Sequence, residues 1–84
     1  MKVLVIDGQG GGIGKAVIET LKKELPEGIT IRALGTNSMA TAKMLKAGAD
    51  DGATGENAIV VNVRHADVIL GVAPILMPNG ILGE

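Results

Sequence analysis

The chain has 84 residues, a formal net charge of −1 and no phenylalanine, tyrosine, tryptophan or cysteine, although 46% of its residues are hydrophobic. This length suits one small domain with an aliphatic core, and the absence of cysteine favours the reducing cytoplasm. Without a basic excess, stacking rings or an apolar stretch of membrane-spanning length, neither a nucleic acid nor a membrane is expected as a partner. We therefore expect a single cytoplasmic domain over residues 1–84.

The first half of the chain alternates strand and helix patterns. Lys2–Ile6 is a short β-branched run typical of a buried strand, and residues 13–25 have the apolar spacing of an amphipathic helix. The stripe expected to be buried on that helix consists of Ile13, Val17, Ile18, Leu21 and Leu25. Ile29–Leu34 predicts a second strand, and the turn residues Gly35–Ser38 precede a second helix over residues 39–47. This β-α-β-α order predicts parallel strands joined by right-handed crossovers.

The second half of the chain is less regular. The segment 49–57 is rich in glycine, aspartate and asparagine, and predicts a loop that can include a very short strand. We favour a short helix over residues 55–65, with Thr54 as its N-cap, over a strand at 58–63. The reason is that Val68–Leu70 is an evident buried strand, whereas the residues before it make a poor hairpin turn.

The last residues contain two apolar runs separated by the turn sequence Pro78–Gly80. We expect these apolar runs to pack against a partner subunit or against further sequence of the same protein. The whole pattern predicts the α/β class: a Rossmann-like parallel sheet with flanking helices and about three main strands. Such a fold is half the size of a complete dinucleotide-binding domain, which uses two βαβαβ halves.

The most informative segment is Asp7–Lys15, in which five glycines fill seven positions between the first strand and the first helix. Such a loop turns tightly and exposes main-chain N–H groups at the positive end of the helix dipole, where phosphate binds well. A tight connection alone rarely needs five glycines. We predict a phosphate-binding loop formed by Gly8, Gln9, Gly10, Gly11, Gly12, Ile13, Gly14 and Lys15. The N–H groups of residues 10–14 would hold the phosphate, and Lys15 would add positive charge.

The glycine spacing distinguishes among known phosphate loops. The dinucleotide fingerprint G-x-G-x-x-G fails in every frame, whereas G-x-x-x-G-x-G matches at Gly8, Gly12 and Gly14. With the Gly-Ile-Gly ending, this segment resembles the short-chain dehydrogenase/reductase family over residues 1–35. That resemblance implies only the nucleotide-binding half of the family, because its catalytic Tyr-x-x-x-Lys requires a tyrosine and this chain has none.

A degenerate P-loop ATPase is a further alternative. Residues 11–15 resemble the deviant P-loop of partition-type ATPases, and Gly14-Lys15 fits the end of the ordinary P-loop pattern. Ala16, however, replaces the hydroxyl residue that holds Mg²⁺. A second carboxylate for the metal is not evident, since Asp67 begins its predicted strand instead of ending it.

Thr36 and Asn37 follow the second strand, where a dinucleotide site usually has an acidic residue for the adenosine ribose. Both residues are neutral, and no arginine is present there to meet a 2′-phosphate. We expect Thr36 and Asn37 to contact the ribose, with NAD or NADP as the candidate cofactors.

Asp7 stands at the entrance of the loop and would oppose an anion. At about 5 Å and an effective dielectric of about 20, that repulsion costs about 3 kcal/mol. Lys15 could offset much of it, or Mg²⁺ could bridge Asp7 and the phosphate. As a structural alternative, the Asp7 carboxylate caps the N–H groups of the glycine loop itself.

The chain is similar along its whole length to a small bacterial family whose function is not established. The resemblance rests on Met1–Lys15, Ala33–Asn37, Gly52–Ala58 and Leu82–Glu84. It supports a Rossmann-like fold with a single site and implies no activity. Because members continue past the equivalent of Glu84, it also implies a chain shortened at its C-terminus.

We expect a nucleotide- or dinucleotide-phosphate-binding protein that forms a homo-oligomer, because a two-fold dimer would supply the missing half of a dinucleotide site. The alternative is a structural or regulatory oligomer that uses the fold without a nucleotide. No nucleophile–base pair can be assembled from the sequence, so catalytic residues stay unassigned. The single histidine, His65, has no partner at metal-ligand spacing, and no metal site is expected.

Overall fold

The computed structural model of the chain describes residues 1–25 and 27–72 and has the predicted α/β architecture. Four parallel strands form one sheet in the order β3-β2-β1-β4, and a helix follows each of the first three strands. The elements are β1 (Lys2–Asp7), α1 (Gly12–Glu24), β2 (Thr30–Gly35), α2 (Ser38–Lys46), β3 (Asp51–Thr54), α3 (Glu56–Val63) and β4 (Val68–Val72). The turn and apolar runs predicted near the end of the chain lie outside the described residues.

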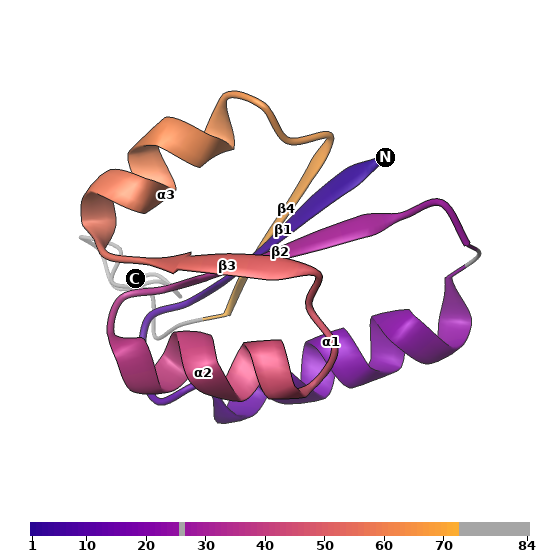
Figure 1. Ribbon diagram of the computed structural model, residues 1–84, viewed down its shortest axis with the longest axis horizontal. Coiled ribbons are helices and arrows are strands. Elements are labelled where there is room, and N and C mark those ends of the chain that lie inside the picture. Colours follow the sequence, from indigo (N-terminus) through magenta and orange to yellow (C-terminus); the bar gives the residue numbers. More distant parts are fainter. Residues whose placement is uncertain (26, 73–84) are drawn as a thin grey trace, which may run out of the picture.

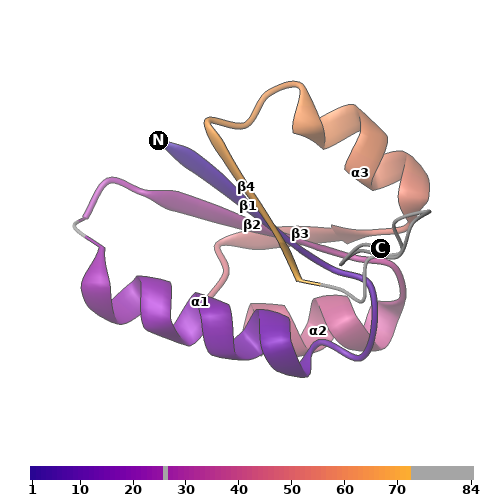
Figure 2. The ribbon, with the colours of Figure 1, turned by 180° about the vertical axis from the view of Figure 1, so that it is seen from behind.

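The helices lie on both sides of the sheet. α1 and α2 cover one face and α3 lies over the other, as the views from the front and from behind agree (Figures 1 and 2). β1 pairs with β2 on one side and with β4 on the other, so the chain reverses its direction of winding between β1 and β4. In doubly wound sheets, ligands bind outside the carboxyl ends of the strands at such a reversal.

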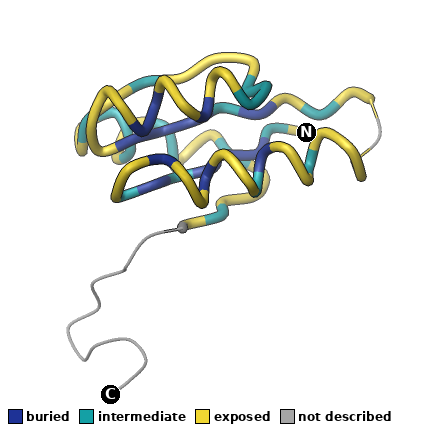
Figure 3. The backbone as a smooth tube through the Cα atoms, turned by 90° about the horizontal axis from the view of Figure 1, so that it is seen from below, coloured by how far each residue is buried: buried dark blue, intermediate teal, exposed yellow. Residues whose placement is uncertain are grey.

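The main core lies between the sheet and the helices α1 and α2. Buried residues, dark blue in Figure 3, lie along the strands and along the sides of the helices that face the sheet. The core cluster contains Val3, Val5, Ile18, Ile31, Ala33, Ala40 and Met44. On the other face Leu4 and Leu34 are fully buried, yet no residue of α3 is. Among the described residues, most of the core therefore lies between the sheet and the helices α1 and α2, and α3 contributes little to it.

The buried stripe predicted for α1 is only partly correct. Gly14 and Ile18 are the buried residues of this helix, whereas Ile13 is 59% exposed and Leu25, just after the helix, is 37% exposed. A spacing of four residues advances by about 40° per step around an α-helix, so a long stripe with that spacing leaves the interface at both ends. The contact is centred on Gly14 and Ile18 instead.

The second half of the chain holds a helix where we favoured one, but its start differs. Gly55, not Thr54, is the N-cap of α3, because Thr54 is the last residue of β3 and lies opposite Gly35 of β2. The short strand allowed in the loop is real, which gives four strands in place of about three. β4 was expected to be buried, but it is an edge strand of the described sheet, with Val68 37% and Ile69 46% exposed.

Candidate functional site

The glycine loop lies at the carboxyl edge of the sheet, beside the connections that leave β2 and β3 (Figure 1, left). Main-chain hydrogen bonds join the three connections. The Thr36 amide donates to the Asp7 carbonyl at 3.2 Å, and the Gly55 amide donates to the Gly35 carbonyl at 2.9 Å. The fold thus brings together the predicted loop and the residues after the second strand, as a shared site requires.

Asp7 is the buried acid of this edge and holds the glycine loop in shape. Its side chain is 1% exposed and accepts hydrogen bonds from the amide of Gln9 at 2.7 Å and from the amide of Gly14 at 2.9 Å. The carboxylate therefore caps the loop from inside, as the structural alternative expected. Because the Gly14 amide already donates to Asp7, it is not available to a phosphate. Of the amides predicted to hold the phosphate, those of residues 10–13 are left.

Gly11 and Gly14 are glycines that the fold itself requires. Gly11 is the N-cap of α1 with a φ of +92°, and a Cβ placed on it would lie 2.8 Å from the Cα of Ala40. A Cβ on Gly14 would lie 2.6 Å from the sulfur of buried Met44 and 3.0 Å from the Asp7 carboxylate. These two glycines let α1 and α2 approach each other closely.

Gly10 and Gly12 differ from that pair. Within the described chain, a Cβ built on either one meets no atom within 4 Å, and neither has a left-handed φ. Both residues are exposed. Neither backbone conformation nor packing among the described residues demands a glycine at these two positions.

Several loop amides have no acceptor in the part of the chain that the structure describes. Among residues 1–25 and 27–72, no hydrogen bond is formed by the N–H groups of Gly10, Gly11, Gly12 and Ile13. The first N–H groups of an α-helix have no partner within the helix and carry its positive dipole end. Lys15 is exposed in the first turn of α1 and forms no ion pair with any described residue. The loop is therefore rich in hydrogen-bond donors, with the Lys15 cation in the first turn of α1 and the Asp7 carboxylate buried behind it.

Asn37 and Thr36 lie beside the loop, but the Asn37 side chain is engaged within the chain. Its Oδ1 accepts from the Ala40 amide at 2.9 Å, which caps α2, and its Nδ2 donates to the Gln9 carbonyl at 2.8 Å. Thr36 is exposed, and in the described part of the chain its hydroxyl forms no hydrogen bond. Of the predicted pair, only Thr36 has its side-chain oxygen fully available.

The side chains that could bind a metal ion do not form a cluster in the described part of the chain. In the described ranges no three histidine, cysteine, aspartate or glutamate side chains lie close enough to hold a metal ion. Asp67 is at the opposite, amino edge of the sheet, where its carboxylate accepts from the Lys2 amide at 2.7 Å. A P-loop arrangement with Asp67 as the second carboxylate is therefore not formed here.

A polar cluster around Arg32, on the α3 face of the sheet, was not predicted. The Arg32 guanidinium donates to both carboxylate oxygens of Asp51, at 2.7 and 2.8 Å, and to Oδ1 of Asn62 at 2.6 Å. The hydrogen bonds between Arg32 and Asp51, together with the attraction of their charges, raise the pKa of Arg32 and lower the pKa of Asp51. The cluster ties α3 to the sheet, and a lone arginine within an apolar strand was its only signal in the sequence.

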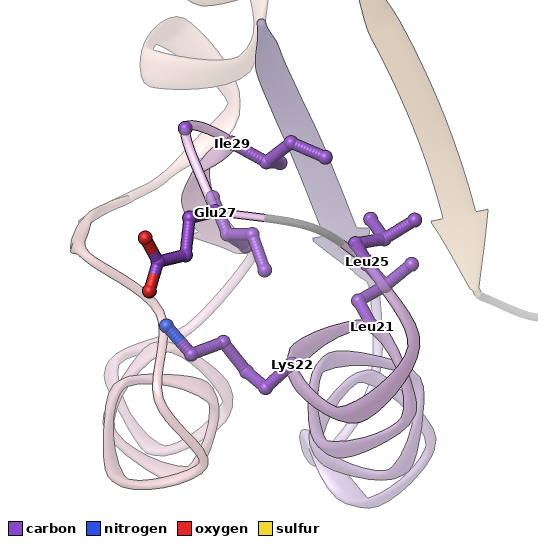
Figure 4. A pocket seen from close by; sticks show the side chains of 7 residues that line it. Leu21, Lys22, Leu25, Glu27 and Ile29 are labelled. Carbon is purple, nitrogen blue, oxygen red and sulfur yellow. The ribbon is translucent and has the colours of Figure 1, made fainter.

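A hollow of about 260 Å³ lies at the amino edge, away from the glycine loop. Figure 4 shows Lys22 and Glu27 on one side of it and Leu21 and Leu25 on the other. It is lined by Leu21, Lys22, Leu25, Glu27, Gly28, Ile29 and Ile31. None of these was predicted to bind a ligand, and parallel α/β sheets hold their ligands at the other edge. We therefore assign the candidate site to the glycine loop.

Fold and site together define a half-sized, Rossmann-like α/β protein with a glycine-rich loop at the carboxyl edge of a parallel sheet. The chain belongs to the family described as Domain of unknown function (DUF3842), whose model matches residues 2–84. This agrees with the resemblance to a small family without an established function. Comparison with curated proteins gave no match, and comparison with solved structures gave none either. None of the helices in the described ranges has the length and apolar character needed to cross a membrane.

Proposed function

We propose that the protein binds a phosphate-bearing nucleotide at the glycine loop, with the phosphate on the amides of Gly10, Gly11, Gly12 and Ile13. Support comes from the amides themselves, which have no acceptor among the described residues and lie at or just before the start of α1, a helix of 13 residues. Main-chain N–H groups at a helix start bind phosphate through both hydrogen bonds and the helix dipole.

The observation that carries the proposal is the presence of glycine at positions 10 and 12. Neither position needs glycine for its conformation or for packing within the described chain. A glycine also has a cost, because it is the least favourable residue after proline at helical positions such as 12. Close approach of a ligand to the main chain explains both glycines, since a side chain there would hold a phosphate away.

The charges at the loop favour an anion only in part. Lys15 supplies a cation in the first turn of α1, while the buried Asp7 carboxylate lies behind the loop. The Asp7 carboxylate accepts hydrogen bonds from two amides of the loop, and these hydrogen bonds partly neutralise its negative charge. We therefore propose that the main-chain donors hold the phosphate and that Lys15 offsets the repulsion from Asp7.

The residues beside the loop favour one class of ligand. The exposed Thr36 side chain would contact a ribose hydroxyl, and no acidic side chain follows β2 to select NAD in the usual way. A single βαβαβ half binds one nucleotide, so NAD or NADP would require a second copy of the chain. The proposal is a mononucleotide-sized site that becomes a dinucleotide site in a homodimer.

A panel of ligands tests the proposal by thermal unfolding. The panel contains NAD(H), NADP(H), FAD, ATP, GTP and inorganic phosphate, each with and without Mg²⁺. A ligand at 100 times its dissociation constant stabilises the fold by about 2.7 kcal/mol. We expect a shift with at least one phosphate compound and none with the corresponding nucleoside, and the Gly12→Ala variant should show a shift no more than about half as large. No shift with any compound would refute the proposal.

A structural or regulatory oligomer is the second candidate function. It is favoured by exposed apolar side chains on and near α3, where Val60 is 58%, Val61 53% and Ile69 46% exposed. Exposed apolar groups that lie together usually mark a contact with another protein. Light scattering on the wild type and on the Val61→Lys variant tests this role. A wild type that is oligomeric and binds no phosphate compound, together with a monomeric variant, would favour the structural role over nucleotide binding.

A further inference from the structure

The side chain of Asn37 joins two connections that are far apart in the sequence. It is the N-cap of α2, with Oδ1 accepting from the Ala40 amide at 2.9 Å. Its Nδ2 donates to the Gln9 carbonyl at 2.8 Å, across 28 positions of the sequence. Among the described residues, this is the only side-chain hydrogen bond between the β2–α2 connection and the glycine loop.

The hydrogen bond acts on one particular peptide group of the loop. The carbonyl of Gln9 and the N–H of Gly10 belong to the same planar unit, and no peptide bond of the described chain is cis. In a trans peptide the C=O and the N–H point in opposite directions. Asn37 therefore turns the Gln9 oxygen toward α2 and the Gly10 N–H away from it.

The neighbouring peptide group is held from the other side. The Gln9 N–H donates to the Asp7 carboxylate at 2.7 Å, so both backbone groups of Gln9 have partners in the chain. A Cβ built on Gly10 would meet no described atom within 4 Å, and the Gly10 N–H forms no hydrogen bond with a described residue. Without Asn37, nothing described would fix the direction of that N–H.

We infer that Asn37 is a positioning residue for the phosphate loop, and not the ribose contact that its place after the second strand predicted. It holds the Gln9 carbonyl away from the bound anion and sets the direction of the Gly10 N–H. This inference rests on the proposed function, because the loop is positioned for the phosphate group. Preorganised donors bind more tightly than donors that must be turned on binding.

The variant Asn37→Ser separates positioning from capping. Serine is a good N-cap and retains an acceptor for the Ala40 amide, but its side chain is too short to reach the Gln9 carbonyl. The matched control is Asn57→Ser, which changes an exposed asparagine on α3. The probe is inorganic phosphate, which has no ribose, so a ribose contact would leave its affinity unchanged.

Two measurements are made on the three proteins: the dissociation constant for inorganic phosphate, and the residual dipolar coupling of the Gly10 N–H in the free state. We expect Asn37→Ser to bind phosphate about three- to tenfold more weakly, the loss of one hydrogen bond. Its Gly10 coupling should change while the couplings of the sheet stay the same. Asn57→Ser should match the wild type in both measurements.

The outcomes separate this inference from the proposed function. If the wild type binds phosphate and Asn37→Ser binds it equally well, the positioning role is refuted while the phosphate loop stands. An unchanged Gly10 coupling with weaker binding also refutes it, since the N–H has then not turned. If the wild type binds no inorganic phosphate, the positioning role is refuted, whereas the proposed function is refuted only if no compound of the ligand panel shifts the unfolding of the wild type.

Discussion

The glycine loop contains two pairs of glycines that the fold treats differently. At Gly11 and Gly14, an added Cβ would collide with Ala40 and with Met44, so the close packing of α1 against α2 depends on both. At Gly10 and Gly12, an added Cβ would meet no described atom. Packing explains the first pair, and we propose that a ligand explains the second pair.

This difference shows that a glycine-rich motif can combine two requirements that sequence alone does not separate. All five glycines look alike as letters, and the spacing Gly8, Gly12, Gly14 mixes the two pairs. Only the placement of α2 over the loop reveals which positions are crowded. Substitution by alanine, one position at a time, therefore tests the two explanations independently.

The largest effect is expected at Gly11. The Gly11→Ala variant places a side chain at a φ of +92° and within 2.8 Å of the main chain of Ala40. Left-handed strain and overpacking together should cost about 3 kcal/mol of the free energy of unfolding. Urea unfolding measures the loss. A variant as stable as the wild type would show that α2 does not pack on the loop as described.

Unlike Gly11→Ala, the Gly12→Ala variant is expected to keep its stability and to lose affinity for phosphate. Its stability should equal that of the wild type or exceed it by up to about 1 kcal/mol, because alanine is favoured over glycine at a helical position. Its affinity for the phosphate compound should fall by about tenfold or more, since a methyl group obstructs close approach to the main chain. Calorimetric titration checks the affinity, and full binding by this variant would contradict the assignment of the second pair.

Lys15 should contribute less than the main chain. A lysine about 4 Å from a phosphate gains about 1 kcal/mol in bulk water, so Lys15→Gln should weaken binding by about three- to tenfold. The effect should shrink at high salt, because the exposed charge is screened. Lys22→Gln, at the far end of α1, is the matched control and should leave the affinity unchanged at every salt concentration.

Much of this fold could be predicted from the sequence, because the pattern of the first half repeats. Lys2–Ile6 and Ile29–Leu34 are apolar runs bounded by turn residues, and both are strands. The strand Asp51–Thr54 was harder to recognise, since it has one apolar side chain and is held by pairing with β2. Local propensity cannot reveal a strand that a neighbour imposes.

The site could be predicted only in outline. The sequence predicted that the glycine loop and the segment after β2 lie together, because parallel strands bring their carboxyl ends to one edge. The roles of Asp7 and Asn37 depend on contacts at 2.7 to 2.9 Å across the fold. Side-chain partners at that distance follow from tertiary packing, which spacing in the sequence does not encode.

The smallest expected effect lies away from the loop and serves as a reference. Arg32 lowers the pKa of Asp51 in the folded chain, so their ion pair stabilises the fold above about pH 4 and this stabilisation is lost as the pH falls further. The pair is partly exposed, and Asp51→Asn should cost about 0.5 kcal/mol at neutral pH and nothing at low pH. Its phosphate affinity should equal that of the wild type, and a change would link α3 to the loop.

The most direct test of the phosphate loop is an NMR titration of the ¹⁵N-labelled protein with inorganic phosphate. We expect large, saturable shifts of the amide signals of Gly10, Gly11, Gly12 and Ile13. The Gly14 signal should move little, because its N–H already donates to Asp7. Saturable shifts confined to the hollow at Leu21 and Ile29, or no shifts at all, would refute binding of phosphate at the loop.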